Sequence, residues 1–364
     1  MRKVLMILPA MNVSGGIENL FLNYLRHIDR ERYCFDFVVH EMNDISVGHM
    51  AEDLGAKVFL MPPFSPRTMK KIGEKYKRIL SSGNYDIVHS SMANASFFYL
   101  SEAKKAGIGV RIQHSHQDRA ADRLSHAVRN IPLLKMGNSQ ATANAACSEN
   151  AGRFLFKQKP FFIINNAIDY DKFRFDEEKR REFRNRYSLR NEFVVGTAGR
   201  LCPQKNQAHL LRDFQKLKEI KHDAMLLIAG EGEFKDSLQL LCAELSVSNS
   251  VIFLGPVKEM PSFLSAIDCF VFTSLYEGLP VSGVEAQANG LPCVFSDTIT
   301  KEADISGNVD FLSLDKPSSF WASVIASGKR QERPSVLSDR FDITVQAKRL
   351  MDFYDSLVSS ETSI

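Results

Sequence analysis

Two glutamates stand eight positions apart in the stretch YEGLPVSGVEAQANGLP, residues 276–292. Glu277 precedes a glycine–proline turn, and Glu285 falls inside a helix expected to begin at about Val281, since proline suits a first helical turn. Paired carboxylates hydrolyse a glycosidic bond when they flank it, about 5–9.5 Å apart. Both acids here come from one short segment on one side of a site, which favours gripping the hydroxyls of a sugar. A solvated helix face is the alternative for Glu285.

Two cations follow another predicted strand. The stretch GRLCPQKN, residues 199–206, comes after an apolar run and opens a helix near Asn206. Arg200 offers a forked guanidinium and Lys205 a compact ammonium, and together they suit a diphosphate. Free amides within residues 278–281 would face the same anionic or hydroxyl-rich ligand. A solvated surface pair is the alternative for the two cations.

Two glycine-containing loops also follow strands. In SGGIE, residues 14–18, Gly15 and Gly16 let the backbone approach a phosphate, although a tight turn alone explains them. In AGEGE, residues 229–233, Gly230 would let a ribose or base come near the backbone. Neither loop reads GxGxxG, so a dehydrogenase is disfavoured.

Two histidines end a strand in RIQHSHQD, residues 111–118. Alternation along a strand places His114 and His116 on the same side. Neither a carboxylate nor a cysteine stands at a spacing that would complete a metal site. We therefore expect no metal, and polar histidines that face a ligand.

Strand-like apolar runs alternate with helical patterns, which predicts parallel sheets covered by helices on both faces. The runs lie at 3–8, 35–39, 56–61, 85–89, 110–114, 143–147, 161–165, 193–199, 224–230, 251–255, 269–274 and 292–296. The join between two doubly wound units falls near 165–170, where an apolar strand gives way to a charged segment. Ligands bind beyond the carboxyl ends of such strands, where every motif above lies.

The composition is that of a soluble globular protein, with 44% hydrophobic and 24% charged residues. The apolar start is expected to be a buried strand rather than a signal peptide, and no run is long enough to span a membrane. Six scattered cysteines suggest free thiols in a reducing cytoplasm. Residues 1–168 carry 22 basic and 14 acidic residues, about +8, against about −5 for the rest. A basic half suits an anionic membrane, with drift in surface charge as the alternative.

In this order, the motifs resemble those of the family 4 retaining glycosyltransferases. EGLPVSGVE is similar to the family's E-x7-E motif, GRLCPQKNQ to its arginine–lysine arm, SGGIE to its N-terminal loop and NNAID to its domain junction. CSENAGRFLF also looks like the segment before that junction. The resemblance covers about residues 3–300 and is strongest to bacterial enzymes that build capsular and exopolysaccharides. Gly283 departs from the pattern, at a helix-propensity cost of about 1 kcal/mol.

The resemblance implies two facing Rossmann-like domains of the GT-B type. Residues 1–168 would bind the acceptor together with a last helix at about 343–364, and residues 169–342 would bind the donor. Arg200 and Lys205 would hold the diphosphate, and Glu285 the ribose. His116, or else His114, would lie near the donor sugar. The remaining donor contacts implied are Gly15, Gly16, Gly230, Glu277, Gly278, Leu279, Pro280 and Val281.

The resemblance also implies metal-independent, retaining transfer from a UDP-sugar to a saccharide or lipid-linked saccharide in surface polysaccharide synthesis. We expect a cytoplasmic enzyme without a nucleic-acid partner, attached to the inner face of the membrane through the basic stretches 70–80 and 122–137. Two alternatives remain open: a UDP-sugar 2-epimerase on the same fold, and a non-catalytic sugar-nucleotide-binding protein.

Overall fold

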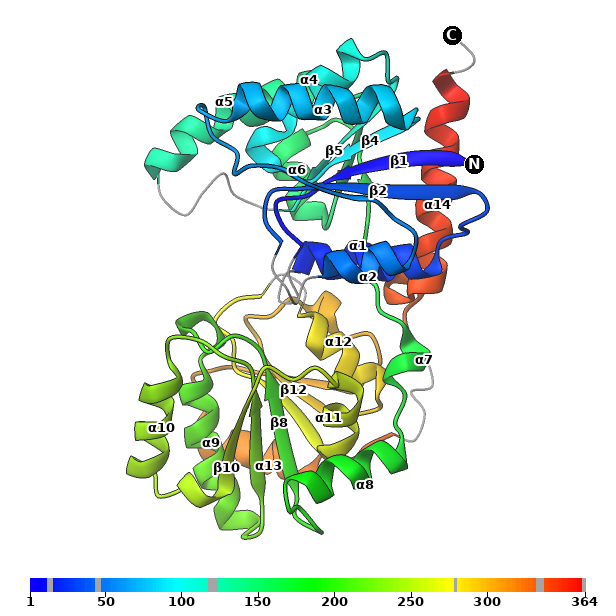
Figure 1. Cartoon of the computed structure of the whole chain (residues 1–364). Coiled ribbons are helices and arrows are strands. Elements are labelled where there is room, and N and C mark those ends of the chain that lie inside the picture. The colour runs from blue at the N-terminus through cyan, green and yellow to red at the C-terminus, as the bar shows by residue number, and fades with distance from the viewer. Residues whose placement is uncertain (12–15, 43–46, 117–123, 278–279, 332–336, 362–364) are drawn as a thin grey trace. The chain divides into compact units, whose positions relative to one another are not determined.

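Two compact units make up the chain. The computed structural model describes residues 1–11, 16–42, 47–116, 124–277, 280–331 and 337–361. The first unit is Met1–Ala167 with Ile343–Ile364, and the second is Ile168–Asp342. Each contains one parallel sheet with helices on both faces (Figure 1). The predicted fold class, a doubly wound α/β protein, is therefore confirmed.

The first unit contains a seven-stranded sheet in the order β3-β2-β1-β4-β5-β6-β7. Its strands are β1 (Arg2–Ile7), β2 (Tyr33–Val39), β3 (Val58–Leu60), β4 (Ile87–Ser90), β5 (Val110–Ser115), β6 (Ala143–Ala146) and β7 (Phe162–Ile163). Its helices are α1 (Gly16–His27), α2 (Val47–Asp53), α3 (Met69–Gly83), η1 (Ala93–Ala95), α4 (Ser96–Lys105), α5 (Leu124–Gln140), α6 (Glu149–Phe156) and α14 (Ile343–Glu361).

Each face of this sheet packs against its own layer of helices. One layer contains α1 and α14, and the other contains α3 and α4 (Figure 1). The central strand β1 is buried on both sides, which explains its continuous apolar run. In α3 the buried residues Ile72, Tyr76, Ile79 and Leu80 recur at helical spacing, so the cations between them face solvent.

The last helix, α14, is part of the core of the first unit. The Tyr33 hydroxyl donates to the Met351 carbonyl oxygen at 3.0 Å and lies 2.6 Å from Asp355 Oδ1. The rings of Phe162 and Phe353 stack with centroids 4.3 Å apart. At the junction motif, Asn165 Nδ2 donates to an oxygen of Gln346 at 3.1 Å. The segment from Phe162 to Asn165 is therefore held against α14 by a ring contact and a hydrogen bond.

The second unit contains a six-stranded sheet in the order β10-β9-β8-β11-β12-β13. Its strands are β8 (Val194–Ala198), β9 (Met225–Ala229), β10 (Val251–Gly255), β11 (Cys269–Phe272), β12 (Cys293–Ser296) and β13 (Val309–Leu312). Its helices are α7 (Tyr170–Phe173), α8 (Glu177–Arg186), η2 (Pro203–Lys205), α9 (Gln207–Ile220), α10 (Lys235–Glu244), η3 (Ser248–Ser250), α11 (Met260–Ala266), α12 (Val281–Ala288), η4 (Lys301–Ala303), α13 (Ser318–Ser327) and η5 (Asp339–Phe341).

Two apolar layers enclose the second sheet. One contains α8, α11 and α12, and the other contains α9, α10 and α13 with the fully buried Trp321. The edge strand β13 was not among the predicted runs. It is short and only partly buried, and Asp310 interrupts its apolar sequence, so it lacks the signal of a central strand.

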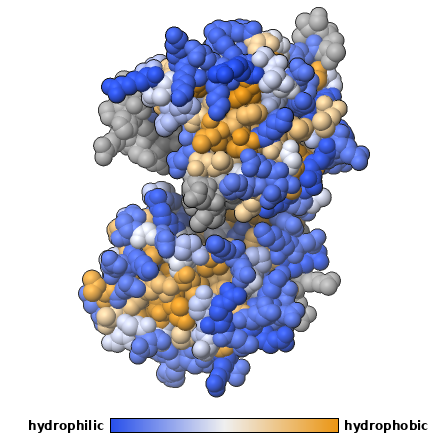
Figure 2. Space-filling view, viewed as in Figure 1, coloured by the Kyte–Doolittle hydropathy of each residue, from blue (hydrophilic) through white to orange (hydrophobic). Residues whose placement is uncertain are grey.

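The surface mixes polar and apolar side chains. On the face seen in Figure 2, hydrophilic residues surround the apolar patches of each unit. No described helix is long and apolar enough to cross a membrane. All six cysteines lie in the described ranges, where none of them forms a disulfide, and four are buried.

Candidate active site

Most of the predicted donor-binding residues gather beyond the carboxyl ends of the strands of the second sheet. Strand β8 pairs with β9 on one side and β11 on the other, so the connections leave the sheet in opposite directions at the β8–β11 pair. Such a switch point is where open α/β sheets bind ligands, beyond the carboxyl ends of the strands. Arg200 and Lys205 follow β8, Gly230 follows β9, and Glu277 follows β11.

The loop that carries Arg200 is held against the loop after β9. The Leu201 amide donates to the Glu231 carbonyl at 2.8 Å, and the Gly199 amide donates to the Ala229 carbonyl at 2.9 Å. Gly230 has φ +130°, and a Cβ there would lie 2.0 Å from the carbonyl oxygen of Gly199. Glycine is thus required at 230 because two backbones meet there, and the predicted contact of Gly230 with a ribose or base stays a prediction.

On its other side the same loop is joined to the end of β11. The Leu275 amide donates to the Gln204 carbonyl at 2.8 Å, and Gln204 Nε2 donates to the Tyr276 carbonyl at 2.9 Å. The Thr273 hydroxyl donates to the Asn206 carbonyl at 2.9 Å. These bonds bring Lys205 and Glu277 together, although 72 positions separate them in the sequence.

Lys205 and Glu277 form a partly buried ion pair. The distance from Lys205 Nζ to Glu277 Oε1 is 2.7 Å, and their side chains are 18% and 9% exposed. Glu277 Oε1 accepts no hydrogen bond from a described residue, so the contact is electrostatic. Lys205 Nζ also lies 4.9 Å from the centroid of the Phe272 ring, a cation–π contact. The lysine therefore has a fixed position before any ligand arrives.

Arg200 is exposed and forms no ion pair with another described residue. Contact with the Cys202 side chain, and then the charge of Glu233, raise the pKa of Arg200 above its ordinary value, so it remains a cation. Its carbonyl oxygen accepts a hydrogen bond from Gln207 Nε2 at 3.0 Å. The backbone of Arg200 is thereby held while its guanidinium remains open to an anion.

Helix α12 begins at Val281, as predicted, and carries Glu285 one turn later. No side chain caps its amino end; Pro280 stands at that position. Burial raises the pKa of Glu285 to about 7, although the nearby Lys172 opposes this shift. At neutral pH the carboxyl group is therefore poised between its charged and neutral forms.

The departure at Gly283 has a structural reason. A Cβ at this position would lie 2.7 Å from Phe295 Cζ and 3.3 Å from Phe272 Cε2. Both rings belong to the buried apolar layer beneath α12. Glycine therefore lets the helix pack closely on the sheet, and the loss of helix propensity is a consequence of that packing.

Both predicted histidines lie in the first unit, where His114 is buried beside His89 and His116 is partly exposed. His114 is 1% exposed, and its ring stacks on that of His116 with centroids 3.9 Å apart. The distance from His114 Nδ1 to His89 Nε2 is 3.1 Å. No group of three His, Cys, Asp or Glu that could hold a metal ion occurs among the described residues.

Some predicted residues fall elsewhere. Gly16 starts α1, whereas Gly15, Gly278 and Leu279 lie outside the described residues. Sequence reasoning missed His89 and Lys172. His89 occurs within an apolar strand and Lys172 within a charged segment, so neither residue had a motif to mark it.

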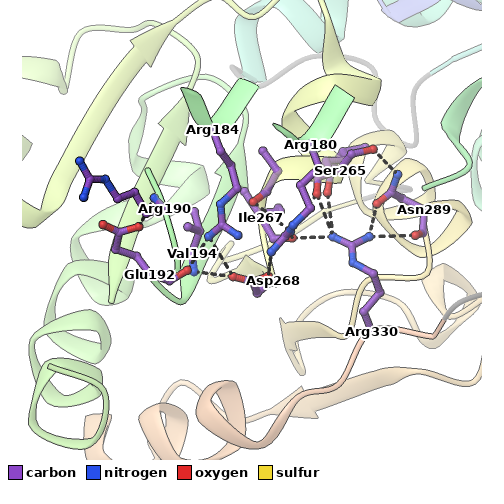
Figure 3. Close-up of polar contacts among 12 residues, drawn as sticks. Arg180, Arg184, Arg190, Glu192, Val194, Ser265, Ile267, Asp268, Asn289 and Arg330 are labelled. Carbon is purple, nitrogen blue, oxygen red and sulfur yellow. Dashed lines mark hydrogen bonds and ion pairs between the residues drawn. The ribbon is translucent and has the colours of Figure 1, made fainter. Parts of the chain in front are cut away.

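A second polar cluster lies at the amino ends of the strands of the same sheet (Figure 3). Asp268 precedes β11, and its carboxylate lies 2.7 Å from Arg180 and 3.5 Å from Arg184. Arg180 Nη1 donates to the Ser265 carbonyl at 3.0 Å, and Arg330 Nη2 donates to the Leu264 carbonyl at 3.1 Å. Arg180 and Arg330 therefore cap the carboxyl end of α11, where free carbonyls and the helix dipole favour cations.

A cavity of about 640 Å³ lies beside this cluster. It is lined by Glu177, Arg180, Arg181, Arg184, Asn185, Leu189, Arg190, Asn191, Glu192, Phe193, Lys221, Asp223 and Asp268. None of these is a predicted site residue, and both cations and acids line the cavity. Because β8 and β11 start here, the cavity lies at the amino ends of the strands, away from the switch-point site.

Comparisons with known proteins relate the second unit, and then nearly the whole chain, to glycosyltransferases. The family model for glycosyl transferases group 1 matches residues 179–310, which include every predicted donor contact of the second unit. EpsF of Bacillus subtilis, assigned as a glycosyltransferase, is 33% identical over 353 residues, covering 92% of this chain and 89% of its own.

Two further similarities are more distant. A protein of Escherichia coli named UDP-Gal:alpha-D-GlcNAc-diphosphoundecaprenol alpha-1,3-galactosyltransferase is 24% identical over 303 residues, covering 79% of this chain and 77% of its own. The crystal structure of Anabaena HepE in complex with UDP superimposes with a TM-score of 0.79 at 18% identity, covering 98% of this chain and 100% of that one. The last similarity shows a shared fold.

Proposed function

Because the chain belongs to the glycosyltransferases of group 1, we propose that it transfers a sugar from a nucleoside-diphosphate sugar to a saccharide or lipid-linked saccharide. We propose UDP as the nucleotide, retention at the anomeric carbon, and no metal ion. The product would be a bacterial surface polysaccharide of the capsular or exopolysaccharide type. In support, HepE is named as a complex with UDP, and the Escherichia coli relative is named for UDP-Gal and a diphosphoundecaprenol-linked acceptor.

The observation that carries the proposal is the Lys205–Glu277 pair at the switch point, next to Arg200. Departure of a nucleoside diphosphate develops negative charge, which fixed cations stabilise without reorganisation. Arg200 and Lys205 would supply that charge. Open amides at the start of α12 would add hydrogen bonds to the same anion.

The two glutamates would hold the sugar and ribose. Glu285 is assigned to the ribose hydroxyls, which an ionised carboxylate accepts as a pair of hydrogen bonds. Glu277 is assigned to the donor sugar, together with the backbone N–H groups of Gly278, Leu279 and Val281. We propose His116 next to the reacting sugar, with the departing phosphate helping to deprotonate the acceptor hydroxyl. The acids then bind hydroxyls and do not attack the anomeric carbon.

Transfer from a panel of UDP-sugars to lipid-linked saccharides tests the assignment. Arg200→Ala and Lys205→Ala should each lower kcat about 10²–10³-fold, as loss of a charge-stabilising donor does elsewhere. Arg212→Ala removes an exposed arginine of α9, outside the proposed site, and should leave transfer unchanged. Full activity in a folded Arg200→Ala or Lys205→Ala protein would reject the proposed site.

The same assay separates the other two functions. Formation of an epimer from the UDP-sugar without acceptor would instead identify a 2-epimerase. Binding of donor without any turnover, across all acceptors, would identify a sugar-nucleotide-binding protein.

We also propose a cytoplasmic enzyme that attaches to anionic lipid through its first unit. In α3 the exposed cations include Lys70, Lys71 and Lys77, and the apolar face of this helix is used in the core. In α5 the exposed Ile131 and Met136 add apolar contact, being 43% and 49% exposed. A basic surface with nearby apolar side chains suits the interface of an anionic membrane.

Flotation with anionic vesicles at low salt tests the membrane proposal. Wild-type protein should float. Lys70→Glu combined with Lys71→Glu should lower the vesicle-binding constant about 30-fold or more, since each cation near the surface contributes about 1 kcal/mol. Reversal of two exposed lysines of the second unit, Lys258→Glu with Lys316→Glu, should have little effect. If the wild-type protein did not float, attachment to anionic lipid would be rejected.

A further inference from the structure

In the first unit, a connected series of one tyrosine and three histidine side chains extends from α14 to the predicted histidines. The Tyr354 hydroxyl lies 2.8 Å from His89 Nδ1, and His89 Nε2 lies 3.1 Å from His114 Nδ1. The ring of His114 then stacks on His116 at 3.9 Å. Tyr354 and His89 are 0% exposed. Phe21 of α1 packs edge-on against His89 and His114.

The direction of the hydrogen bonds in this chain follows from Tyr354. Within the described part of the molecule, His89 Nδ1 is the single hydrogen-bond partner of its hydroxyl, and a buried hydroxyl must donate. His89 Nδ1 is therefore the acceptor, so the proton of this neutral ring lies on Nε2. His89 Nε2 therefore donates to His114 Nδ1. Since Nδ1 of His114 accepts, the neutral ring of His114 must carry its proton on Nε2.

The outer nitrogens of the two stacked rings are left for a ligand. His114 Nε2 and His116 Nε2 are both buried without a hydrogen bond to any described residue. Burial, and for His114 also the neighbouring histidines, lower the pKa of both rings, that of His116 to about 4. The pair is therefore neutral at physiological pH. Leaving such buried groups unsatisfied is unfavourable, and a ligand oxygen would satisfy them.

We propose that Tyr354, His89 and His114 are positioning residues for His116. They fix the tautomer of His114 and the orientation of the stacked pair, whose outer nitrogens are kept for an oxygen of the sugar substrate. The proposal rests on the proposed function, because that function places His116 next to the reacting sugar. It gives the last helix a part in the chemistry, since α14 carries the tyrosine that starts the chain.

Tyr354→Phe removes one hydroxyl and so tests whether the tyrosine–histidine series positions His116. The variant should lower kcat about 10-fold to 100-fold with little change in KM for the donor, because a small misplacement of a reacting group has effects of this size. Tyr33→Phe is the matched control. It also removes a hydroxyl that holds α14, at Met351 and Asp355, but does not touch the histidines. It should keep the kcat of wild type.

Ring ¹⁵N chemical shifts give a readout that a merely structural role would not change. In wild type and Tyr33→Phe, His114 should be protonated on Nε2 alone, and in Tyr354→Phe the two tautomers should mix. His89→Gln keeps an N–H toward His114 and should retain more activity than His89→Leu.

Two results would overturn the proposal: His114 shifts in Tyr354→Phe equal to those of the control, or a changed tautomer with an unchanged kcat. If wild-type protein transfers no sugar at all, the proposed function fails. The nitrogen shifts still decide whether Tyr354 and His89 fix the tautomer of His114.

Discussion

At the scale of single residues, the candidate site contains one pair of opposite charges that already contact each other. Lys205 and Glu277 lie 2.7 Å apart, so neither charge is buried alone before the donor arrives. Loss of one partner of a buried pair leaves the other uncompensated, which is costly for the fold. We therefore expect Lys205→Ala and Glu277→Ala to lose some stability as well as activity, whereas Arg200→Ala should lose activity alone. Urea unfolding of the three variants beside wild type measures the difference.

Glu285 gives the site a dependence on pH. Because its pKa is about 7, the carboxylate that accepts the ribose hydroxyls is lost as pH falls through this value. We expect kcat/KM for the donor to fall about tenfold for each pH unit below 7. Glu285→Gln should be weak at every pH and show no such step.

The stability of the Glu285→Gln protein provides the control. A folded pKa raised above the unfolded value of 4.5 means that the native state holds the proton more tightly, so wild type loses stability as pH rises from 4.5 to 7. The loss is on the order of 2–3 kcal/mol, and the variant should not show it. Equal pH profiles of unfolding for the two proteins would contradict the assigned pKa.

At the scale of elements, the carboxyl end of α11 depends on Arg330. Its guanidinium donates to the carbonyls of Leu264 and Asn289 at 3.1 and 3.0 Å, and burial lowers its pKa to about 10. Arg330→Ala should lower the free energy of unfolding by about 2–4 kcal/mol, measured in urea, because buried carbonyls lose their donor. The exposed neighbour Lys329 is the control.

Donor binding should survive this change, since the cap lies at the amino ends of β8 and β11. A loss of donor affinity in folded Arg330→Ala protein, without the stability change, would show that the cluster in Figure 3 belongs to the functional site instead.

At the scale of the whole molecule, the two units should respond to acid in opposite ways. Burial lowers the pKa of His89 to about 3 and of His116 to about 4 in the first unit, below the unfolded value of 6.5. The unfolded chain then binds more protons, so this unit loses stability as pH falls below 6.5, by about 2 kcal/mol per histidine at pH 5. Glu285 has the opposite effect in the second unit.

Trp321 is the single tryptophan of the chain and is fully buried in the second unit, so its fluorescence reports that unit alone. Far-ultraviolet circular dichroism reports both units. At pH 5 the loss of helix should begin below the temperature at which the fluorescence changes, and at pH 7.5 the two should lie closer together. Coincident transitions at both values would contradict the prediction.

Much of this organisation could be predicted from sequence because the signals are local. Continuous apolar runs mark the central strands, and Pro280 marks the start of α12. The contacts that define the site are not local. Lys205 meets Glu277 because β8 lies beside β11, and the pKa of Glu285 depends on how α12 is buried. His89 was not predicted because an isolated histidine in an apolar strand has the same appearance as any core position.

The return of α14 to the first unit has a practical consequence. The polypeptide passes between the units twice, after Ala167 and after Asp342, and Ile168 forms a β-bridge with Asp342 where these passages enter the second unit. A protease that cut one passage would leave two fragments without a covalent bond between them, held together by the packing of α14 in the first unit. A polypeptide cut short at Asp342 would not lose a dispensable tail; it would lack part of the first unit's interior, and Tyr354 with it.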